Sequence, residues 1–380
     1  MSSALGVGSV FVWQGGAVPA DIRDSSLPVA GVRAQWSWAE RVRRYRAVSK
    51  RLAALDDSHV GAVLEEAAAA TVGIGGTTAN VSIDGEPVFV KRVPLTDLER
   101  RTENVGSTAN VFRLPMFYQY GIGSAGFGAW REVAVHAMTT RWVLDRRFHG
   151  FPLLYHWRVL PQPPQPADLG ELERWVEHWD GDDAIRARLQ SIGTASAAVA
   201  LFMEHIPDTV DAWLTAQTTA GGEAAEAAYT FVHDGLQEGV KFMQGQGLTH
   251  FDAHFRNLLT DGHRLYFADF GLAAHSGFDL NAEESAFVRR HHGYDRGYTV
   301  THLIEWLTSN LLNIPWPDSL GYVREHLPDL RDLGLPGSAA RIVARHAPVA
   351  AVMGDFYRAL TETSKRTPFP ADDLNRAFQL

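Results

Sequence analysis

Two short motifs lie close together in residues 247–274 of this 380-residue chain, in the passage GLTHFDAHFRNLLTDGHRLYFADFGLAA. Asp252 and Asn257 belong to an H-x-D-x-x-x-x-N run, and Asp269 opens a D-F-G motif 12 residues after Asn257. A predicted long helix, residues 223–246, precedes both motifs, and the strand-like runs LLT and RLYFA lie between them. This order and spacing are typical of sites that arrange two carboxylates and an amide around one phosphoryl group.

Each of the three side chains has a chemical task in such a site. Transfer of a γ-phosphoryl group depends on positioning and on neutralising charge, and needs little covalent help from the protein. The pattern therefore predicts that Asp252 accepts the proton of an acceptor hydroxyl group. It also predicts that Asn257 and Asp269 bind Mg²⁺, which prefers hard oxygen ligands.

A lysine that contacts phosphate is expected upstream, on a strand that follows a glycine-bearing hairpin. Lys91 in PVFVK fits this position, because the pair Asp84-Gly85 between two strand-like runs predicts a hairpin. Its partner should be a glutamate on a helix. We select Glu132, which begins a predicted helix leading into the strand-like run FPLLYHW, over Glu99 and Glu103, which lack that context.

With these motifs the chain resembles the protein-kinase-like superfamily over about residues 70–310, and within it most resembles the aminoglycoside phosphotransferase type of small-molecule kinases. The resemblance implies an α+β, bilobal protein-kinase-like fold with a β-rich N-lobe and a helical C-lobe. The expected parts are an N-terminal extension with an amphipathic helix (1–70), an N-lobe (71–203) with insertions at about 95–125 and 161–195, and a C-lobe with the catalytic loop and acceptor site (204–380).

The resemblance also implies roles for individual residues. Lys91 would contact the α- and β-phosphates of ATP or GTP, and Glu132 would orient Lys91. The backbone of the hinge, Glu204, His205 and Ile206, would meet the purine edge. The phosphates would lie under a loop formed by Gly75, Gly76, Thr77 and Thr78, which departs from the pattern because Thr78 stands where a third glycine would fall.

His254 separates the branches of the superfamily. Two residues after the catalytic aspartate, protein Ser/Thr kinases typically have lysine and the small-molecule branch has histidine, so His254 favours a small-molecule hydroxyl acceptor. The resemblance implies an antibiotic-like or natural-product acceptor and a role in resistance. Phe251 replaces the arginine by which many protein kinases read a phosphorylated loop, and no A-P-E motif follows Asp269. The sequence DFGLA, in contrast, is typical of Ser/Thr protein kinases. A Ser/Thr protein kinase and a nucleotide-sensing pseudokinase therefore remain alternative functions.

A second glycine pattern points to a different class of protein. Gly121, Gly123 and Gly126 form a G-x-G-x-x-G run that would suit an NAD-type oxidoreductase. No alternating β and α pattern follows this run, as a dinucleotide-binding fold would require. We therefore interpret segment 121–128 as a flap over the cleft or as part of the acceptor site.

Composition excludes several other classes. The net charge of −9 does not indicate a partner such as nucleic acid or an anionic membrane, and the absence of cysteine excludes disulfides and thiolate metal sites. No apolar run approaches the ~20 residues that span a bilayer, and no positive segment precedes the first apolar stretch, so a cytoplasmic location is expected. The oligomeric state is not indicated by the sequence.

Two groups of charged residues are interpreted as solvated. The first is a basic helix face formed by Arg41, Arg43, Arg44, Arg46, Lys50 and Arg51. The second follows the D-F-G motif, where a role in the acceptor pocket is the alternative, and consists of His275, Asp279, Glu283, Glu284, Arg289, Arg290 and Asp295.

Overall fold

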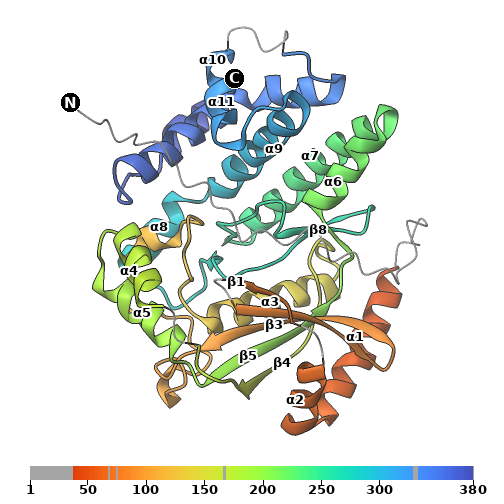
Figure 1. Ribbon diagram of the computed structural model, residues 1–380. Helices are drawn as coiled ribbons and strands as arrows, with labels where there is room; N and C mark the ends of the chain where they lie inside the picture. The colour runs from red at the N-terminus through yellow and green to blue at the C-terminus, as the bar shows by residue number, and fades with distance from the viewer. Residues whose placement is uncertain (1–36, 67–68, 74–75, 166–167, 328–332, 380) are drawn as a thin grey trace, which may run out of the picture.

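The computed structural model describes residues 37–66, 69–73, 76–165, 168–327 and 333–379. Figure 1 shows a β-sheet at one end of the molecule and a group of helices at the other, with helix α3 (Ala129–Leu144) between them. The antiparallel sheet and the separate helices agree with the predicted α+β class. None of the described helices is long and apolar enough to cross a membrane.

Two helices, α1 (Trp38–Ala54) and α2 (Asp57–Glu66), precede the main sheet, whose strands are β1 (Ala69–Gly73), β2 (Gly76–Ile83), β3 (Glu86–Leu95), β4 (Leu154–Pro161) and β5 (Ala197–Glu204). The strand order is β1-β2-β3-β5-β4, and the described neighbours all pair antiparallel. The predicted hairpin joins β2 to β3. Asp84 and Gly85 both have positive φ, 51° and 85°, as a two-residue turn of this kind requires.

The alternation of side chains along β3 directs Lys91 to one face of the sheet. Val93 packs in an apolar cluster with Val133 of α3, whereas Val88 and Val90 belong to the cluster that includes α1 and α2. Successive residues of a strand point to opposite faces. Lys91 therefore shares the face of Val93, toward α3 and the helical end of the molecule.

Helix α1 brings a buried cation to the end of β5. Arg41 lies on the same side of α1 as the buried Val48 and is only 2% exposed. Its guanidinium donates from Nε to Glu204 Oε1 (2.9 Å), from Nη2 to Glu204 Oε2 (2.6 Å), and to the carbonyl groups of His149 (3.0 Å) and Phe151 (2.8 Å). The interpretation of Arg41 as part of a solvated face is wrong, because its carboxylate partner lies 163 residues away in sequence.

We expect Arg41→Met to lower the free energy of unfolding by about 3–5 kcal/mol, because it leaves the carboxylate of Glu204 buried without its cation. Chemical denaturation would measure this. Arg43→Gln is the matched control on the same helix, since the Arg43 side chain is 72% exposed, and it should change stability by no more than about 0.5 kcal/mol. The double variant Arg41→Met with Glu204→Met should recover most of the loss; equal stability of the Arg41 and Arg43 single variants would contradict the prediction.

The helical end of the molecule consists of α6 (Val210–Ala220), α7 (Gly222–Gly245), α8 (Ala282–Arg290), α9 (Tyr294–Leu312), α10 (Ser319–Glu325), α11 (Gly337–Glu362) and α12 (Ala371–Ala377), with a short 3-10 helix, η3 (Trp316–Asp318). The predicted long helix at 223–246 is α7. Short strands form two small antiparallel sheets, β6-β8-β9 and β7-β10, from β6 (Asp208–Thr209), β7 (Leu248–Thr249), β8 (Leu258–Thr260), β9 (Leu265–Phe267) and β10 (Ala274–His275). They hold loop 250–257 beside Asp269: the Ala268 N–H donates to the Asn257 carbonyl at 3.0 Å.

Segment 96–128, between β3 and α3, contains two short 3-10 helices, η1 (Thr102–Asn104) and η2 (Met116–Gln119), and neither α-helix nor strand. Helices α4 (Leu169–His178) and α5 (Asp183–Gly193), between β4 and β5, pack against it. The buried ring of Trp179 lies 4.7 Å from that of Tyr118, centroid to centroid. The insertions predicted at about 95–125 and at 161–195 thus contribute to the same apolar cluster.

The glycine run 121–126 follows η2 and precedes α3. A dinucleotide-binding turn instead follows a strand of a parallel sheet. Since the described strands pair antiparallel throughout, the structure argues against the NAD-type oxidoreductase.

Candidate active site

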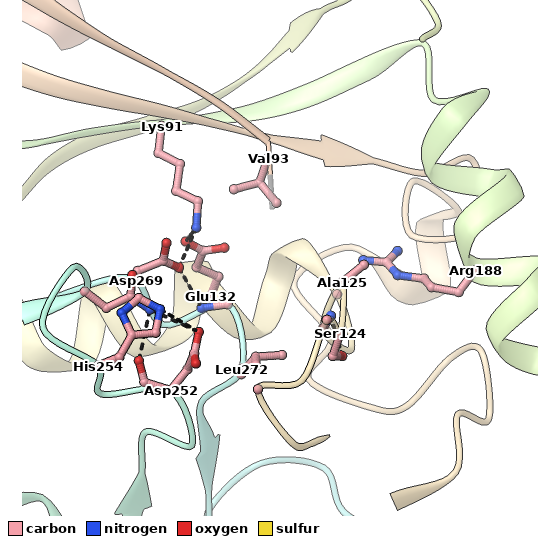
Figure 2. A pocket seen from close by; sticks show the side chains of 16 residues that line it. Lys91, Val93, Ser124, Ala125, Glu132, Arg188, Asp252, His254, Asp269 and Leu272 are labelled. Atoms are coloured by element: carbon pink, nitrogen blue, oxygen red, sulfur yellow. Dashed lines mark hydrogen bonds and ion pairs between the residues drawn. The ribbon is translucent and has the colours of Figure 1, made fainter. Parts of the chain in front are cut away.

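Lys91 forms two close ion pairs on the inner face of the sheet. Its Nζ lies 2.8 Å from Glu132 Oε1 and 2.6 Å from Asp269 Oδ1, as Figure 2 shows. Burial alone would lower the pKa of Lys91, but the two carboxylates outweigh it and raise the pKa above its ordinary value. The lysine therefore remains a cation at neutral pH.

Glu132 reaches Lys91 from the first turn of α3 and is 2% exposed. Burial and the negative charge of Asp269 raise its pKa, and the contact with Lys91 opposes that change. The other two glutamates considered from the sequence have different positions. Glu99 accepts a hydrogen bond from the N–H of Ala129 (2.7 Å) and so caps α3, while Glu103 is exposed.

Helix α9 positions loop 250–257 through hydrogen bonds to the loop backbone. Asp295, in the first turn of that helix, accepts hydrogen bonds from the backbone N–H groups of His250 (2.6 Å) and Phe251 (3.0 Å). Phe251 has a φ of 64°, a left-handed conformation that persists in a bulky residue only where surrounding contacts impose it. Asp295 and Glu284, which pairs with Arg131 at 2.6 Å, are both buried, so for these two the solvated interpretation is wrong.

Asp252 lies in this loop with its carboxylate directed into the site. The Nδ2 of Asn257 donates both to the Asp252 carbonyl (2.9 Å) and to its Oδ2 (3.0 Å), which fixes the side chain. Burial, and then the charge of Asp269, raise the pKa of Asp252 well above its ordinary value. His254 Nε2 lies 3.8 Å from Asp252 Oδ2, and burial lowers the pKa of His254 to about 4, so the imidazole is neutral at pH 7.

Asn257 and Asp269 offer oxygen atoms of the kind that Mg²⁺ prefers. The Asn257 amide uses its nitrogen toward Asp252, which leaves its oxygen for a cation, and the Asp269 side chain is 43% exposed toward the cavity. Burial opposes ionisation of Asp269, but Lys91 lowers its pKa to about 2. In the described part of the chain no group of three or more His, Asp and Glu side chains is arranged to hold a metal. A two-residue site fits Mg²⁺, which usually takes its other ligands from nucleotide phosphates and water.

These side chains open into one cavity of about 210 Å³. It is lined by the predicted residues Lys91, Glu132, Asp252, His254, Asn257 and Asp269. They come from β3, α3, the loop after β7 and the segment after β9. Three carboxylates, an amide, an imidazole and a lysine thus face one volume that is large enough for phosphate groups.

The glycine segment 121–128 forms another wall of this cavity. A Cβ atom at Gly121 would lie 2.4 Å from Asp252 Oδ1, and one at Gly126, where φ is 72°, would lie 2.4 Å from the carbonyl oxygen of Gly271. A side chain at either position would force its neighbour to move, the Asp252 carboxylate at Gly121 and the Gly271 backbone at Gly126. The backbone of the segment therefore passes directly beside Asp252 and the D-F-G motif.

We expect Gly121→Ala to lower the rate of the phosphoryl transfer predicted from the motifs by about 10²-fold, since displacement of a reacting group by about 1 Å has effects of this size. The added methyl group must move Asp252 or the loop, while φ at Gly121 is not in the left-handed region, so the fold should persist. Gly61→Ala is the matched control, because nothing lies within 4 Å of its Cβ position. Steady-state kinetics and circular dichroism of both variants provide the test, and unchanged turnover for Gly121→Ala would contradict it.

The predicted phosphate loop is only partly described. Thr78 pairs with Lys91 across β2 and β3 and so shares its face, whereas Thr77 lies on the opposite face. Gly76 is required by close packing, since its Cβ would lie 2.0 Å from a carbonyl oxygen of β3. Gly75 lies outside the described residues. Neither Gly76 nor the two threonines lines the cavity.

The predicted hinge follows directly from β5. The N–H of Glu204 donates to the Leu153 carbonyl at 2.8 Å, and its carboxylate is held by Arg41. His205 and Ile206 continue the chain outside the cavity lining. The structure therefore keeps the hinge residues apart from the cavity that holds the charged side chains.

Arg188 of α5 also lines the cavity. It is not predicted as a site residue from the sequence, because stretch 161–195 is interpreted there only as an insertion. The available signal is the position of Arg188 three residues after the buried Ile185, on the apolar side of the helix. Burial of an arginine on such a side indicates a specific partner.

Comparison of the chain with models of known protein families and with curated proteins found no match.

Proposed function

We propose that this chain is a Mg²⁺- and nucleotide-dependent O-phosphotransferase that moves the γ-phosphate of ATP or GTP to a hydroxyl group of a small molecule. The observation that carries the proposal is the approach of Lys91 to both Glu132 and Asp269, in the cavity that Asp252 and Asn257 also line. Such a set of groups neutralises phosphate charge and accepts a proton at one place, which is what phosphoryl transfer requires.

The chain's own residues have distinct roles in this proposal. Lys91, kept in position by Glu132, binds the phosphates of the nucleotide. Asn257 and Asp269 hold Mg²⁺, which supplies charge neutralisation at the phosphate oxygens. Asp252 orients the acceptor hydroxyl and accepts its proton.

The fold is consistent with two lobes that meet at this site. The sheet with α3 would be the N-lobe of a bilobal protein-kinase-like fold, at about 71–203, and the helices after β5 would be the C-lobe, at about 204–380. In support, Lys91 and Glu132 come from the sheet and α3, while Asp252 and Asp269 come from loops next to the helical end.

A small-molecule acceptor is favoured over a protein. The neutral His254 stands beside Asp252, and α8 begins soon after the D-F-G motif, which leaves a short connection for docking a peptide. The resemblance suggests a natural-product or antibiotic-like acceptor and a role in resistance. A Ser/Thr protein kinase and a nucleotide-sensing pseudokinase are the competing functions.

The test is transfer of labelled γ-phosphate from ATP and from GTP with Mg²⁺, offered to a panel of antibiotics, nucleosides and sugars and to generic protein acceptors. Label on a small molecule that disappears in Asp252→Asn supports the proposal. Label on protein favours the protein kinase. Nucleotide binding without any transfer favours the pseudokinase.

A further inference from the structure

Arg188 is a buried cation that lines the cavity, and it has no role in the proposed phosphoryl transfer. It belongs to α5, is 2% exposed, and lines the cavity together with Ser124 and Ala125. Figure 2 shows its guanidinium directed toward these two residues, with Lys91 and Asp252 on the opposite side of the view. Its Nε is buried and has no hydrogen-bond partner within the described ranges of the chain.

Other residues fix the guanidinium without satisfying this nitrogen. Nη1 donates to Glu99 Oε2 at 2.7 Å, and the guanidinium carbon lies 5.0 Å from the centre of the Phe112 ring. Glu99 is itself held by the hydroxyl of Thr96 (2.6 Å) and the N–H of Ala129 (2.7 Å). The arginine is thus positioned in advance, and among the residues that the structure describes its Nε has no acceptor.

The remaining charges in the cavity lie elsewhere. Glu132 and Asp269 contact Lys91, and Asp252 is bound by Asn257. The carboxylate nearest to Arg188 is that of Glu99, which is already bound to Nη1 of the arginine and is not among the residues that line the cavity. The side chain of Arg188 lines the cavity, so an anion that enters can accept hydrogen bonds from the guanidinium and offset the cost of its burial.

We propose that Arg188 binds an anionic group, a carboxylate or a phosphate, carried by the acceptor molecule. This inference rests on the proposed function, because it divides the cavity into a transfer end at Lys91 and Asp252 and an anchoring end at Arg188. Arginine holds such groups through paired N–H donors, which also fixes their direction. The acceptor class is therefore a hydroxyl compound that carries an acidic group, anchored so that its hydroxyl faces Asp252.

The same chemistry has a second source, the γ-phosphate of the nucleotide, and the experiment separates the two. With Mg²⁺ and a non-hydrolysable ATP analogue bound, the γ-phosphate position is filled, so inorganic phosphate or acetate reports only a second anion site. Their dissociation constants are measured by calorimetry for the wild type, for Glu99→Gln, and for the double variant Glu99→Gln with Arg188→Gln. The double variant removes both partners of the buried pair and so avoids leaving a lone buried charge.

We expect the double variant to bind phosphate at least about 10-fold more weakly than Glu99→Gln, from which it differs only by the loss of Arg188; this is the range of a charge-assisted hydrogen bond. Equal binding by Glu99→Gln and the double variant, or no binding of either anion to the wild type, overturns the inference. A weaker affinity for the ATP analogue with unchanged affinity for ADP assigns Arg188 to the γ-phosphate and also overturns it. If the wild type binds no Mg²⁺-nucleotide, the proposed function fails, but Arg188-dependent phosphate binding to the free protein still tests the anion site.

Discussion

Asp252→Asn is expected to reduce the rate of phosphoryl transfer by about 10²–10⁴-fold, the contribution of a positioned general base. The substitution keeps the size of the side chain and an oxygen that can accept from Asn257 Nδ2, so folding and Mg²⁺-nucleotide binding should be retained. Only the capacity to take a proton from the acceptor is lost. Single-turnover transfer of labelled phosphate, with nucleotide affinity measured in parallel, gives both quantities.

A matched control for this substitution is Asp234→Asn. The Asp234 side chain is 69% exposed and contacts His233 on α7, outside the cavity lining. Its turnover should equal that of the wild type. Normal turnover in Asp252→Asn would remove Asp252 from the mechanism, whereas loss of nucleotide binding in that variant would mean that its main role is structural.

Asp269→Ala should weaken the binding of Mg²⁺-nucleotide by at least about 100-fold. Loss of a residue that only supports a metal ligand weakens metal binding by about 10- to 100-fold, and loss of a direct ligand should have a larger effect. The lysine would retain Glu132 at 2.8 Å, so Lys91 stays positioned for the phosphates. In the presence of a chelator, wild type and variant should bind free nucleotide with similar affinity. Calorimetry with and without Mg²⁺ therefore separates a metal ligand from a residue that only supports the lysine.

The control for this second variant is Asp97→Ala, which removes a carboxylate that is 82% exposed near Arg100. It should leave the affinity for Mg²⁺-nucleotide unchanged. Should Asp269→Ala lose equal affinity with and without Mg²⁺, Asp269 would act through Lys91 and would not bind the metal.

Local pattern was sufficient for much of the framework. The Asp84-Gly85 turn, the helix at α7 and the alternation along β3 each depend on neighbouring residues, so the sequence predicts them well. Lys91 and Glu132 are 41 residues apart, and the context of each element still selected two side chains that the fold brings to 2.8 Å.

Burial of individual charges depends on partners that local pattern cannot identify. Arg41 has the periodicity of α1, yet its role follows from Glu204 at the far end of β5. In the sequence Asp295 looks like a solvated charge of a loop. In the fold it belongs to α9 and accepts a hydrogen bond from the backbone N–H of His250. In each case the ion pair or hydrogen bond forms only after distant elements have packed.

The sequence alone determined which chemical groups are available here: the H-x-D-x-x-x-x-N and D-F-G motifs, a strand lysine and a helical glutamate, because motif spacing and periodicity are properties of adjacent residues. The tertiary structure decided what surrounds them. It placed the glycine segment against Asp252 and brought Arg188 into the same cavity through the packing of α4 and α5. The physical reason is that desolvation and charge pairing act over a few ångströms in space. The residues concerned are far apart in the sequence, and their sequence separation does not predict that they are close in the fold.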